Sequence, residues 1–538
     1  METKAKYLFF ILVVGAFIFL FNLGARDLWE PDETRYGVVA REMVQSGNWI
    51  VPHLNGELYA EKPPFFFWMV NLSAFFMGEN TEFTNRLPSA LAGLMAILIT
   101  FLFGSKLFNL RTGFLSSLIL GTCFFFPQIS RWMMLDSLFS LFFLLAVYYF
   151  YLGIDYLHKQ RLYFLLAGVF MACGTLTKGP IGYLPILVLI IYSSMLKDFR
   201  KIWNRNLLHA GILSVGLVIA WFLPAMAIAG KNYGIQNVWH QTAGRFAGGW
   251  SHSEPFYFYF VRFPLGFLPW AIFLPWAFYD LFSEGSGEKR KGGLLLFAWF
   301  AFLFLFFSLS KGKKDNYLLP LYPAAAILVG RWLTFFWGPS KESGKAKGKL
   351  WIPIGLVTLI FLGVWLIILF MPLKSFPQEM EVYLPFTIWP LFFIVFGGVL
   401  SLVFLRRRLN GLSIFCLITV LVIGQVFVSV TILPRFNQLC SMKPFCRKIL
   451  ARMTPTDELK IWKFQSTGLL YYTEKPVEQI KGIDHFLRAF RSADRVLMVV
   501  EGEDLAQLKK KVDVPIYPLE GAEVRHRQLF LVSNRADR

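Results

Sequence analysis

Long apolar runs follow one another along most of this chain. A bilayer core of about 30 Å is crossed by an α-helix of about 20 apolar residues. The pattern predicts about thirteen membrane-spanning helices, at residues 7–24, 86–106, 112–129, 133–152, 162–177, 180–196, 208–229, 262–282, 293–309, 317–337, 351–371, 384–405 and 411–432. A shorter apolar run at residues 65–77 lies between Pro64 and Gly78, so we expect an interfacial or re-entrant segment there.

The pattern changes after residue 433, where the chain becomes charged. Short β-like runs at residues 460–464, 495–500 and 528–532 alternate with helix-like runs at 482–491 and 504–511. This alternation predicts a small α/β domain of ordinary size. We therefore expect an all-α polytopic membrane domain over residues 1–433 and a soluble domain over residues 434–538.

Composition and charge fix the class of protein and its orientation. The chain is 56% hydrophobic and only 16% charged, whereas soluble proteins carry about 25% charged residues. The net charge of +20 does not call for nucleic acid, because the basic clusters lie in short loops between spans. All these clusters share the side of the N-terminus, which the positive-inside rule makes cytoplasmic. The outer loops 25–85 and 230–262 and the C-terminal domain are then expected outside, in the periplasm or at the cell exterior.

The five cysteines give little guidance about function. Three fall inside apolar runs and are expected to be packing residues. Cys440 and Cys446 lie near each other after the last span, and a disulfide between them would need an oxidising compartment. The sequence leaves that disulfide open, and it shows no Cys/His spacing typical of structural zinc.

Charged residues gather at the expected outer ends of the spans. Charges this close to hydrocarbon are costly and commonly functional, and outer lysines run against the positive-inside bias. The residues in question are Asp32, Glu33, Arg35, Glu61, Lys62, Asp136, Lys178, His240, Arg245, His252, Lys311, Lys313, Lys314 and Asp315. One polar site for an anionic, amphipathic lipid phosphate would explain them together.

Each candidate also has a simpler interpretation. Asp32 or Glu33 would serve as the N-cap of a helix over residues 33–45. Asp136 would pair with Arg131, and Lys178 would snorkel outward from a loop. The histidines would be ordinary loop residues.

Several short motifs occur along the chain in this order: PDETRY, AEKPP, LD at the start of the fourth span, TKGP, HSEPF with GFLPW, and DNYLLPLYPA. In this order they resemble bacterial lipid A 4-amino-4-deoxy-L-arabinose transferases. That family belongs to the C-type membrane glycosyltransferases, which include the dolichyl-phosphate-mannose protein mannosyltransferases. The resemblance implies the C-type glycosyltransferase fold and a site formed by the outer loops.

The resemblance also implies roles for individual residues. Asp32 and Asp136 would be catalytic acids, whereas phosphate and substrate would be bound by Arg35, Lys62, Lys178, Arg245, Lys314 and Tyr317. Glu61 with His240 or His252 would form a divalent-metal site. The loop reads WHQTAGRF, however, where the family pattern places a histidine closer to the Arg-Phe pair, which leaves that metal open.

The function implied is an inverting transfer of a sugar, 4-amino-4-deoxy-L-arabinose by the resemblance, from a polyprenyl-phosphate donor. The acceptor would be a lipid A phosphate or another envelope molecule at the outer face of the bacterial inner membrane. Protein O-mannosylation or another polyprenyl-phosphate-sugar transfer is the alternative with the same fold. A lipid or sugar transporter is the alternative from another class, but transporters place charges near the membrane midplane.

Overall fold

The computed structural model describes residues 2–197, 199, 201–234, 253–283, 287–337, 343–372 and 384–536. By internal contacts the chain divides into two compact units. Unit 1 comprises Met1–Leu23, Ala60–Met69 and Arg86–Ile432, and unit 2 comprises Gly24–Tyr59, Val70–Asn85 and Leu433–Arg538. The sequence placed the whole first outer loop with the helical domain, whereas most of that loop is grouped here with the C-terminal residues.

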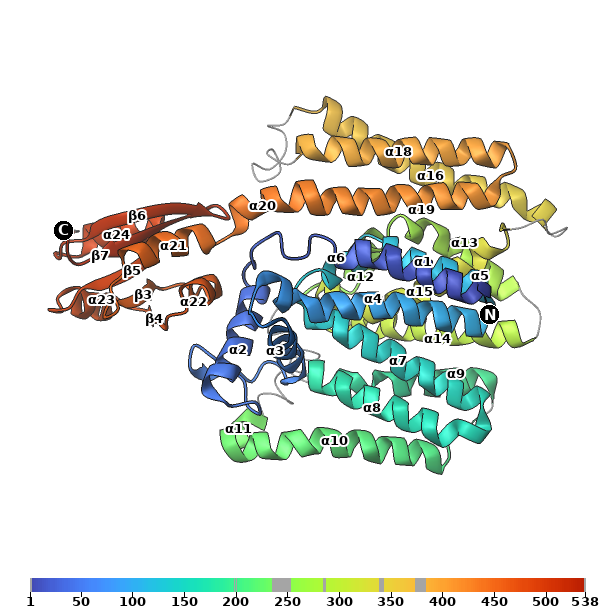
Figure 1. The fold of residues 1–538 in the computed structure, drawn as a ribbon, viewed down its shortest axis with the longest axis horizontal. Helices are drawn as coiled ribbons and strands as arrows, with labels where there is room; N and C mark the ends of the chain where they lie inside the picture. The colour runs from blue at the N-terminus through green and yellow to red at the C-terminus, as the bar shows by residue number, and fades with distance from the viewer. Residues whose placement is uncertain are drawn as a thin grey trace. The chain divides into compact units, whose positions relative to one another are not determined.

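Unit 1 is helical, and the axes of its long helices lie side by side, roughly along one line (Figure 1). Every predicted span overlaps helical residues. The principal helices are α1 (Glu2–Phe19), α4 (Glu82–Leu107), α5 (Leu110–Thr122), α6 (Phe125–Ser130), α7 (Leu135–Asp155), α8 (Gln160–Lys178), α9 (Leu184–Leu196), α10 (Arg205–Ala229), α12 (Phe258–Gly266), α13 (Leu274–Ser283), α14 (Glu288–Leu309), α15 (Tyr322–Thr334), α16 (Ser343–Phe370), α18 (Leu384–Arg406) and α19 (Asn410–Phe427).

Length and apolar composition qualify seven helices of the described chain as membrane spans. An eighth is added if Phe258–Gly266 and Trp270–Ser283, which meet at a bend of 109°, form one broken span. The chain is therefore a multi-pass membrane protein. The run predicted as interfacial or re-entrant forms a separate apolar helix, α3 (Phe65–Met77), which is too short to cross a bilayer.

Small residues allow helices of unit 1 to approach closely. A Cβ added to Gly330 of α15 would lie 2.3 Å from the Ser116 hydroxyl oxygen of α5, so no larger residue fits there. The hydrophobic effect does not drive helices together within lipid, because lipid tails are as apolar as the side chains. Close backbone approach instead supplies the van der Waals contact that holds such helices together. The packing thus explains why glycine and serine interrupt these apolar runs.

The C-terminal part of unit 2 is a three-layer α/β fold. Its sheet has the strand order β4-β3-β5-β7-β6, in which the first three strands are parallel and β7 is antiparallel to both its neighbours. Helices α21 and α22 pack on one face and α23 and α24 on the other. The elements are β3 (Glu458–Trp462), β4 (Val477–Ile480), β5 (Val496–Glu501), β6 (Tyr517–Val524), β7 (Arg527–Ser533), α21 (Lys443–Arg452), α22 (Thr467–Thr473), α23 (Ile483–Phe490) and α24 (Gly502–Lys511).

The N-terminal segments of unit 2 are built onto this α/β fold. They contain α2 (Asp32–Ser46) and a hairpin of β1 (His53–Leu54) and β2 (Glu57–Leu58). At the tip of the hairpin the Asn55 side chain donates to the Val477 carbonyl at 2.8 Å and accepts from its amide at 3.2 Å, which protects the edge strand β4.

An ion-pair network ties three segments of unit 2 together. Lys443 of α21 lies 3.2 Å from the Asp27 carboxylate and 2.5 Å from that of Glu82. Asp27 also accepts hydrogen bonds from Ser441 at 2.7 Å and Asn437 at 2.9 Å. Burial alone would raise the pKa of Asp27, but these hydrogen bonds and the charge of Lys443 together lower it.

The disulfide that the sequence left open is not present. Cys440 and Cys446 are both free thiols, and Cys446 is buried in the core of the α/β fold beside α22. Burial raises the pKa of the Cys446 thiol well above its usual value, so this thiol is a packing group rather than a reactive one.

Candidate functional site

A buried cluster of charged and polar side chains in unit 1 joins three segments far apart in the sequence. Asp136 in the first turn of α7 forms an ion pair with Lys178, the last residue of α8. The Asn316 amide donates to the other oxygen of the Asp136 carboxylate at 2.8 Å. The side chains of Asp136 and Lys178 are only 3% and 7% exposed, so this is a nearly dehydrated charge pair.

Aromatic rings enclose the lysine of this cluster. The Lys178 ammonium lies 4.8 Å from the centre of the Tyr317 ring and 5.3 Å from that of Phe139. Such cation–π contacts hold the ammonium without neutralising it. The structure thus brings Asp136, Lys178 and Tyr317 together, and their roles in catalysis and substrate binding stay predictions.

Both simpler interpretations of this pair are wrong. Arg131 does not pair with Asp136: its guanidinium donates to the carbonyl oxygens of Ile18 at 2.7 Å and Phe21 at 2.8 Å. Lys178 does not snorkel outward, because it is buried against Asp136. Sequence reasoning also missed Asn316, although it lies between the candidates Asp315 and Tyr317 in the motif DNYLLPLYPA.

The lysines before η5 (Asp315–Leu321) have different roles. Lys313 is buried, and its ammonium donates to the carbonyl oxygens of Glu254, at 2.8 Å, and Ser310. These two hydrogen bonds make Lys313 a structural clamp between the segments at Glu254 and Ser310, and burial lowers its pKa. Lys314 is held by its backbone, since the Tyr259 hydroxyl donates to its carbonyl at 2.9 Å. No ion pair of the Lys314 side chain is found in the part of the chain that the structure describes, whereas its neighbour Asp315 lies 3.7 Å from Arg262. The Lys314 ammonium therefore suits an anionic ligand.

The AEKPP motif contributes two half-buried charged residues. Glu61 and Lys62 lie in unit 1 directly before α3, and both already interact with other residues. Their roles in metal or phosphate binding stay predictions.

Asp32 and Arg35 lie in unit 2, on the first turn of α2. They form an ion pair, with side chains 23% and 21% exposed, so the Asp32 carboxylate is both oriented and reachable. The capping interpretation of Asp32 is wrong, because helix α2 begins at Asp32 itself, after Pro31, with no capping hydrogen bond from a side chain.

Glu33 differs from its neighbour. Its carboxylate is 1% exposed and pairs with Arg26 at 2.5 Å, and it accepts the Trp29 amide at 3.1 Å. Glu33 is therefore structural, which leaves Asp32 as the acid of this turn that can meet a substrate.

Asp315 lies 3.7 Å from Arg262, and Lys311 is exposed. Three further candidates, His240, Arg245 and His252, lie outside the described residues. Among the described residues, no three His, Cys, Asp or Glu side chains gather as a metal would require. The metal site at Glu61 is therefore untested.

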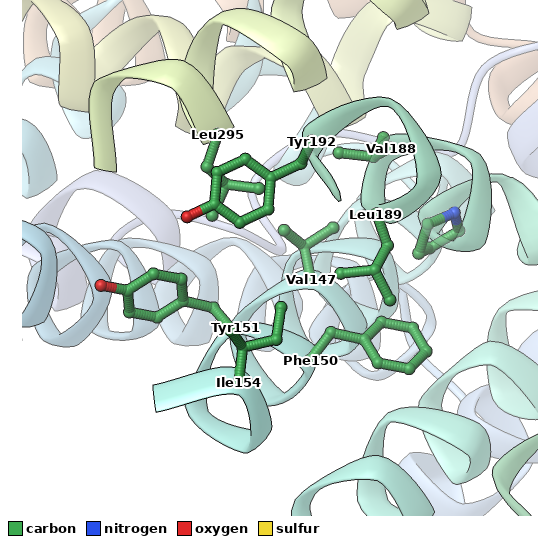
Figure 2. Close-up of a pocket in the computed structure, with 9 residues that line it drawn as sticks. Val147, Phe150, Tyr151, Ile154, Val188, Leu189, Tyr192 and Leu295 are labelled. Carbon is green, nitrogen blue, oxygen red and sulfur yellow. The ribbon is translucent and has the colours of Figure 1, made fainter. Parts of the chain in front are cut away.

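An apolar pocket elsewhere in unit 1 is not part of this site. Figure 2 shows Val147, Phe150, Tyr151 and Ile154 of α7 facing residues of α9 and Leu295 of α14. Its lining contains no Asp, Glu, Lys or Arg, so it offers no cation to a phosphate.

Comparison with known proteins places the chain in a family. A family described as dolichyl-phosphate-mannose-protein mannosyltransferase matches residues 61–226. An undecaprenyl phosphate-alpha-4-amino-4-deoxy-L-arabinose arabinosyl transferase of Pseudomonas savastanoi pv. phaseolicola is 32% identical over 384 residues, which cover 69% of this chain and 68% of the relative. The chain belongs to this arabinosyl transferase family.

Other relatives of the same name are similar over a smaller share of their length. The second such enzyme of Proteus mirabilis is 32% identical over 60% of this chain and 58% of its own length. That of Shewanella sediminis is 32% identical over 70% of this chain and 66% of its own length. The chain thus spans about three fifths to two thirds of these two relatives.

The solved structures show the fold. The crystal structure of ArnT from Cupriavidus metallidurans bound to undecaprenyl phosphate matches with a TM-score of 0.82 at 20% identity, covering 99% of this chain and 98% of that one. The archaeal oligosaccharyltransferase AglB of Archaeoglobus fulgidus matches with a TM-score of 0.54 at 11% identity, covering 92% and 69%. The predicted family resemblance and its membrane glycosyltransferase fold are confirmed.

Proposed function

We propose that this protein transfers 4-amino-4-deoxy-L-arabinose from undecaprenyl phosphate to a lipid A phosphate. Family membership supports the donor, because its relatives are named for that reaction. The observation that carries the proposal is the buried Asp136–Lys178 pair with Asn316. Fixed cations in a dry setting stabilise the negative charge that a departing phosphate develops.

The reaction is a displacement at the anomeric carbon. The bond from that carbon to the polyprenyl phosphate oxygen breaks, and its electron pair leaves with the phosphate. A lipid A phosphate oxygen forms the new bond from the opposite face, which inverts the anomeric centre. This acceptor is already anionic and needs no general base, whereas a hydroxyl acceptor would need one.

Asp32 then has one of two tasks. With a phosphate acceptor it binds the amino group of the sugar or orients Arg35 toward a phosphate, and with a hydroxyl acceptor it removes the proton.

The membrane arrangement is also a proposal. We infer about thirteen crossings, because helices outside the seven long ones, such as α1, α8 and α15, coincide with predicted spans. The basic loops support an N-terminus on the cytoplasmic side of a bacterial inner membrane and an α/β domain on its periplasmic side. A divalent ion at Glu61, His240 and His252 stays a hypothesis that metal analysis of purified protein would test, and no step above uses it.

Protein mannosylation is the second candidate, favoured by the family match over residues 61–226. None of the relatives named above is a transporter, so that alternative has no support.

Reconstituted protein tests these alternatives directly. Vesicles containing the chain would be supplied with undecaprenyl-phosphate aminoarabinose and lipid A, or with a polyprenyl-phosphate mannose and peptides. Only the first pair should react. Asp32→Asn should abolish transfer, whereas the matched variant Glu57→Gln, on the exposed strand β2 of the same loop, should retain it. Full activity of Asp32→Asn would refute the assignment of Asp32.

A further inference from the structure

Hydrogen bonds join the residues before and after Asp32 to the N-terminal end of helix α22. Before Asp32, the Glu30 carboxylate accepts hydrogen bonds from the Ser466 hydroxyl and the Gly468 amide. After it, the Thr34 hydroxyl lies 2.7 Å from that of Thr467. These contacts join residues more than 430 positions apart, all within unit 2.

Thr467 makes a second contact on the other side of Asp32. Its hydroxyl donates to the Pro31 carbonyl oxygen at 3.2 Å. One hydroxyl therefore touches the residue directly before Asp32 and the residue two positions after it. Because Thr34 is fully buried, its hydroxyl finds no water if this partner is lost.

The far end of α2 is fastened to the same short helix. The Arg41 guanidinium donates to the carbonyl oxygens of Leu470 and Tyr471, both at 2.7 Å. Between the two ends, a Cβ on Gly37 would lie 2.6 Å from the Tyr471 ring, so the helices touch where glycine allows it. Helix α22 thus supports α2 along its length.

We propose that α22 of the C-terminal α/β fold positions the Asp32 carboxylate for catalysis, with Thr467 as the principal positioning residue. This inference rests on the proposed function for the role of Asp32. It makes the α/β fold a working part of the transferase site, although none of its residues needs to touch the substrate.

The two threonines of α22 offer a matched test. Thr467→Val keeps the size and shape of the side chain and removes only the hydroxyl. Thr473→Val does the same at the other end, where the hydroxyl donates to Leu469 of its own helix at 2.6 Å. Thr467→Ser keeps the hydroxyl and serves as the rescue variant.

Full-length proteins would be compared by transfer kinetics and by hydrogen exchange of the peptide spanning residues 28–40. Thr467→Val should lower kcat about tenfold with little change in KM, because displacing a reacting group by about 1 Å costs up to about 100-fold in rate. It should also speed exchange in that peptide. Thr467→Ser should restore both values, and Thr473→Val should change neither.

Equal kcat and equal exchange in Thr467→Val and Thr473→Val would overturn the inference. Faster exchange with unchanged kcat would overturn it too, because the contact would then hold α2 without serving catalysis. If the unmodified protein transfers no sugar, the proposed function fails first; exchange in Thr467→Val then decides whether α22 holds the Asp32 turn at all, and unchanged exchange refutes that.

Discussion

Lys178→Met is the perturbation that tests the buried cluster most sharply. Methionine has similar length and no charge, so among the described residues the change leaves the Asp136 carboxylate with Asn316 as its remaining side-chain partner. Breaking a buried pair on one side costs about 3–5 kcal/mol, because the other charge stays dehydrated. With side chains 3% and 7% exposed, the upper part of that range applies.

The double variant Asp136→Asn/Lys178→Met separates stability from catalysis. It removes both charges, and replacing a buried pair by uncharged groups is often neutral. We expect the free energy of unfolding, measured by denaturation in mixed micelles, to return to within about 1 kcal/mol of the starting protein. Sugar transfer should stay lost, because the proposed function requires the Lys178 ammonium to stabilise the charge on the departing phosphate.

A matched control comes from another ion pair of unit 1. Arg331→Met breaks the contact of Arg331 with Asp280, 3.3 Å apart, and should lower stability while folded protein keeps its activity. If Lys178→Met is as stable as the starting protein, the reasoning about a dehydrated pair is refuted. If the double variant transfers sugar normally, the pair is structural and the site assignment falls.

Three further predictions concern other parts of the chain. Lys314→Ala should weaken donor binding about 10- to 100-fold, as loss of a charged hydrogen bond would, whereas the exposed Lys311→Ala should not, and equal KM values would contradict this. Hydrogen bonds and a neighbouring lysine lower the pKa of Asp27 despite its burial, so its contribution to stability should be complete above about pH 4 and vanish as pH falls through the lowered pKa. Asp27→Asn should therefore flatten that part of the thermal-stability profile. An unchanged profile would count against the network. A cysteine at Glu57 should react with an impermeant label from outside the cell and one at Lys159 only after lysis, so the reverse pattern would overturn the topology.

The helices of this protein were predictable because lipid restricts the backbone conformations that a membrane-spanning segment can adopt. Apolar length alone locates helices such as α10 and α16, since every backbone polar group in a membrane must be satisfied within the helix. In the α/β fold the pattern located β3, β5, β7, α23 and α24 within a few residues. It missed β4 and β6, because a four-residue edge strand and a strand with a proline and a glycine carry little alternation.

The sequence was enough to predict which residues are candidates for the site, but only some of the contacts between them. Isolated charges in an apolar chain single out Asp136 and Lys178, since they would be costly there without a purpose. Sequence spacing cannot show that these two face each other across 42 positions, or that Asn316 completes the cluster. It also could not show that Glu33 turns inward to Arg26 while Asp32 remains reachable, because both are ordinary first-turn acids.

The central claim is tested most directly by mass spectrometry of lipid A from cells that lack their own aminoarabinose transferase and express this chain. We predict lipid A that carries one or more added 4-amino-4-deoxypentose residues on its phosphates, and unmodified lipid A when the chain carries Asp32→Asn. Lipid A that stays unmodified while envelope proteins gain a sugar would contradict the account.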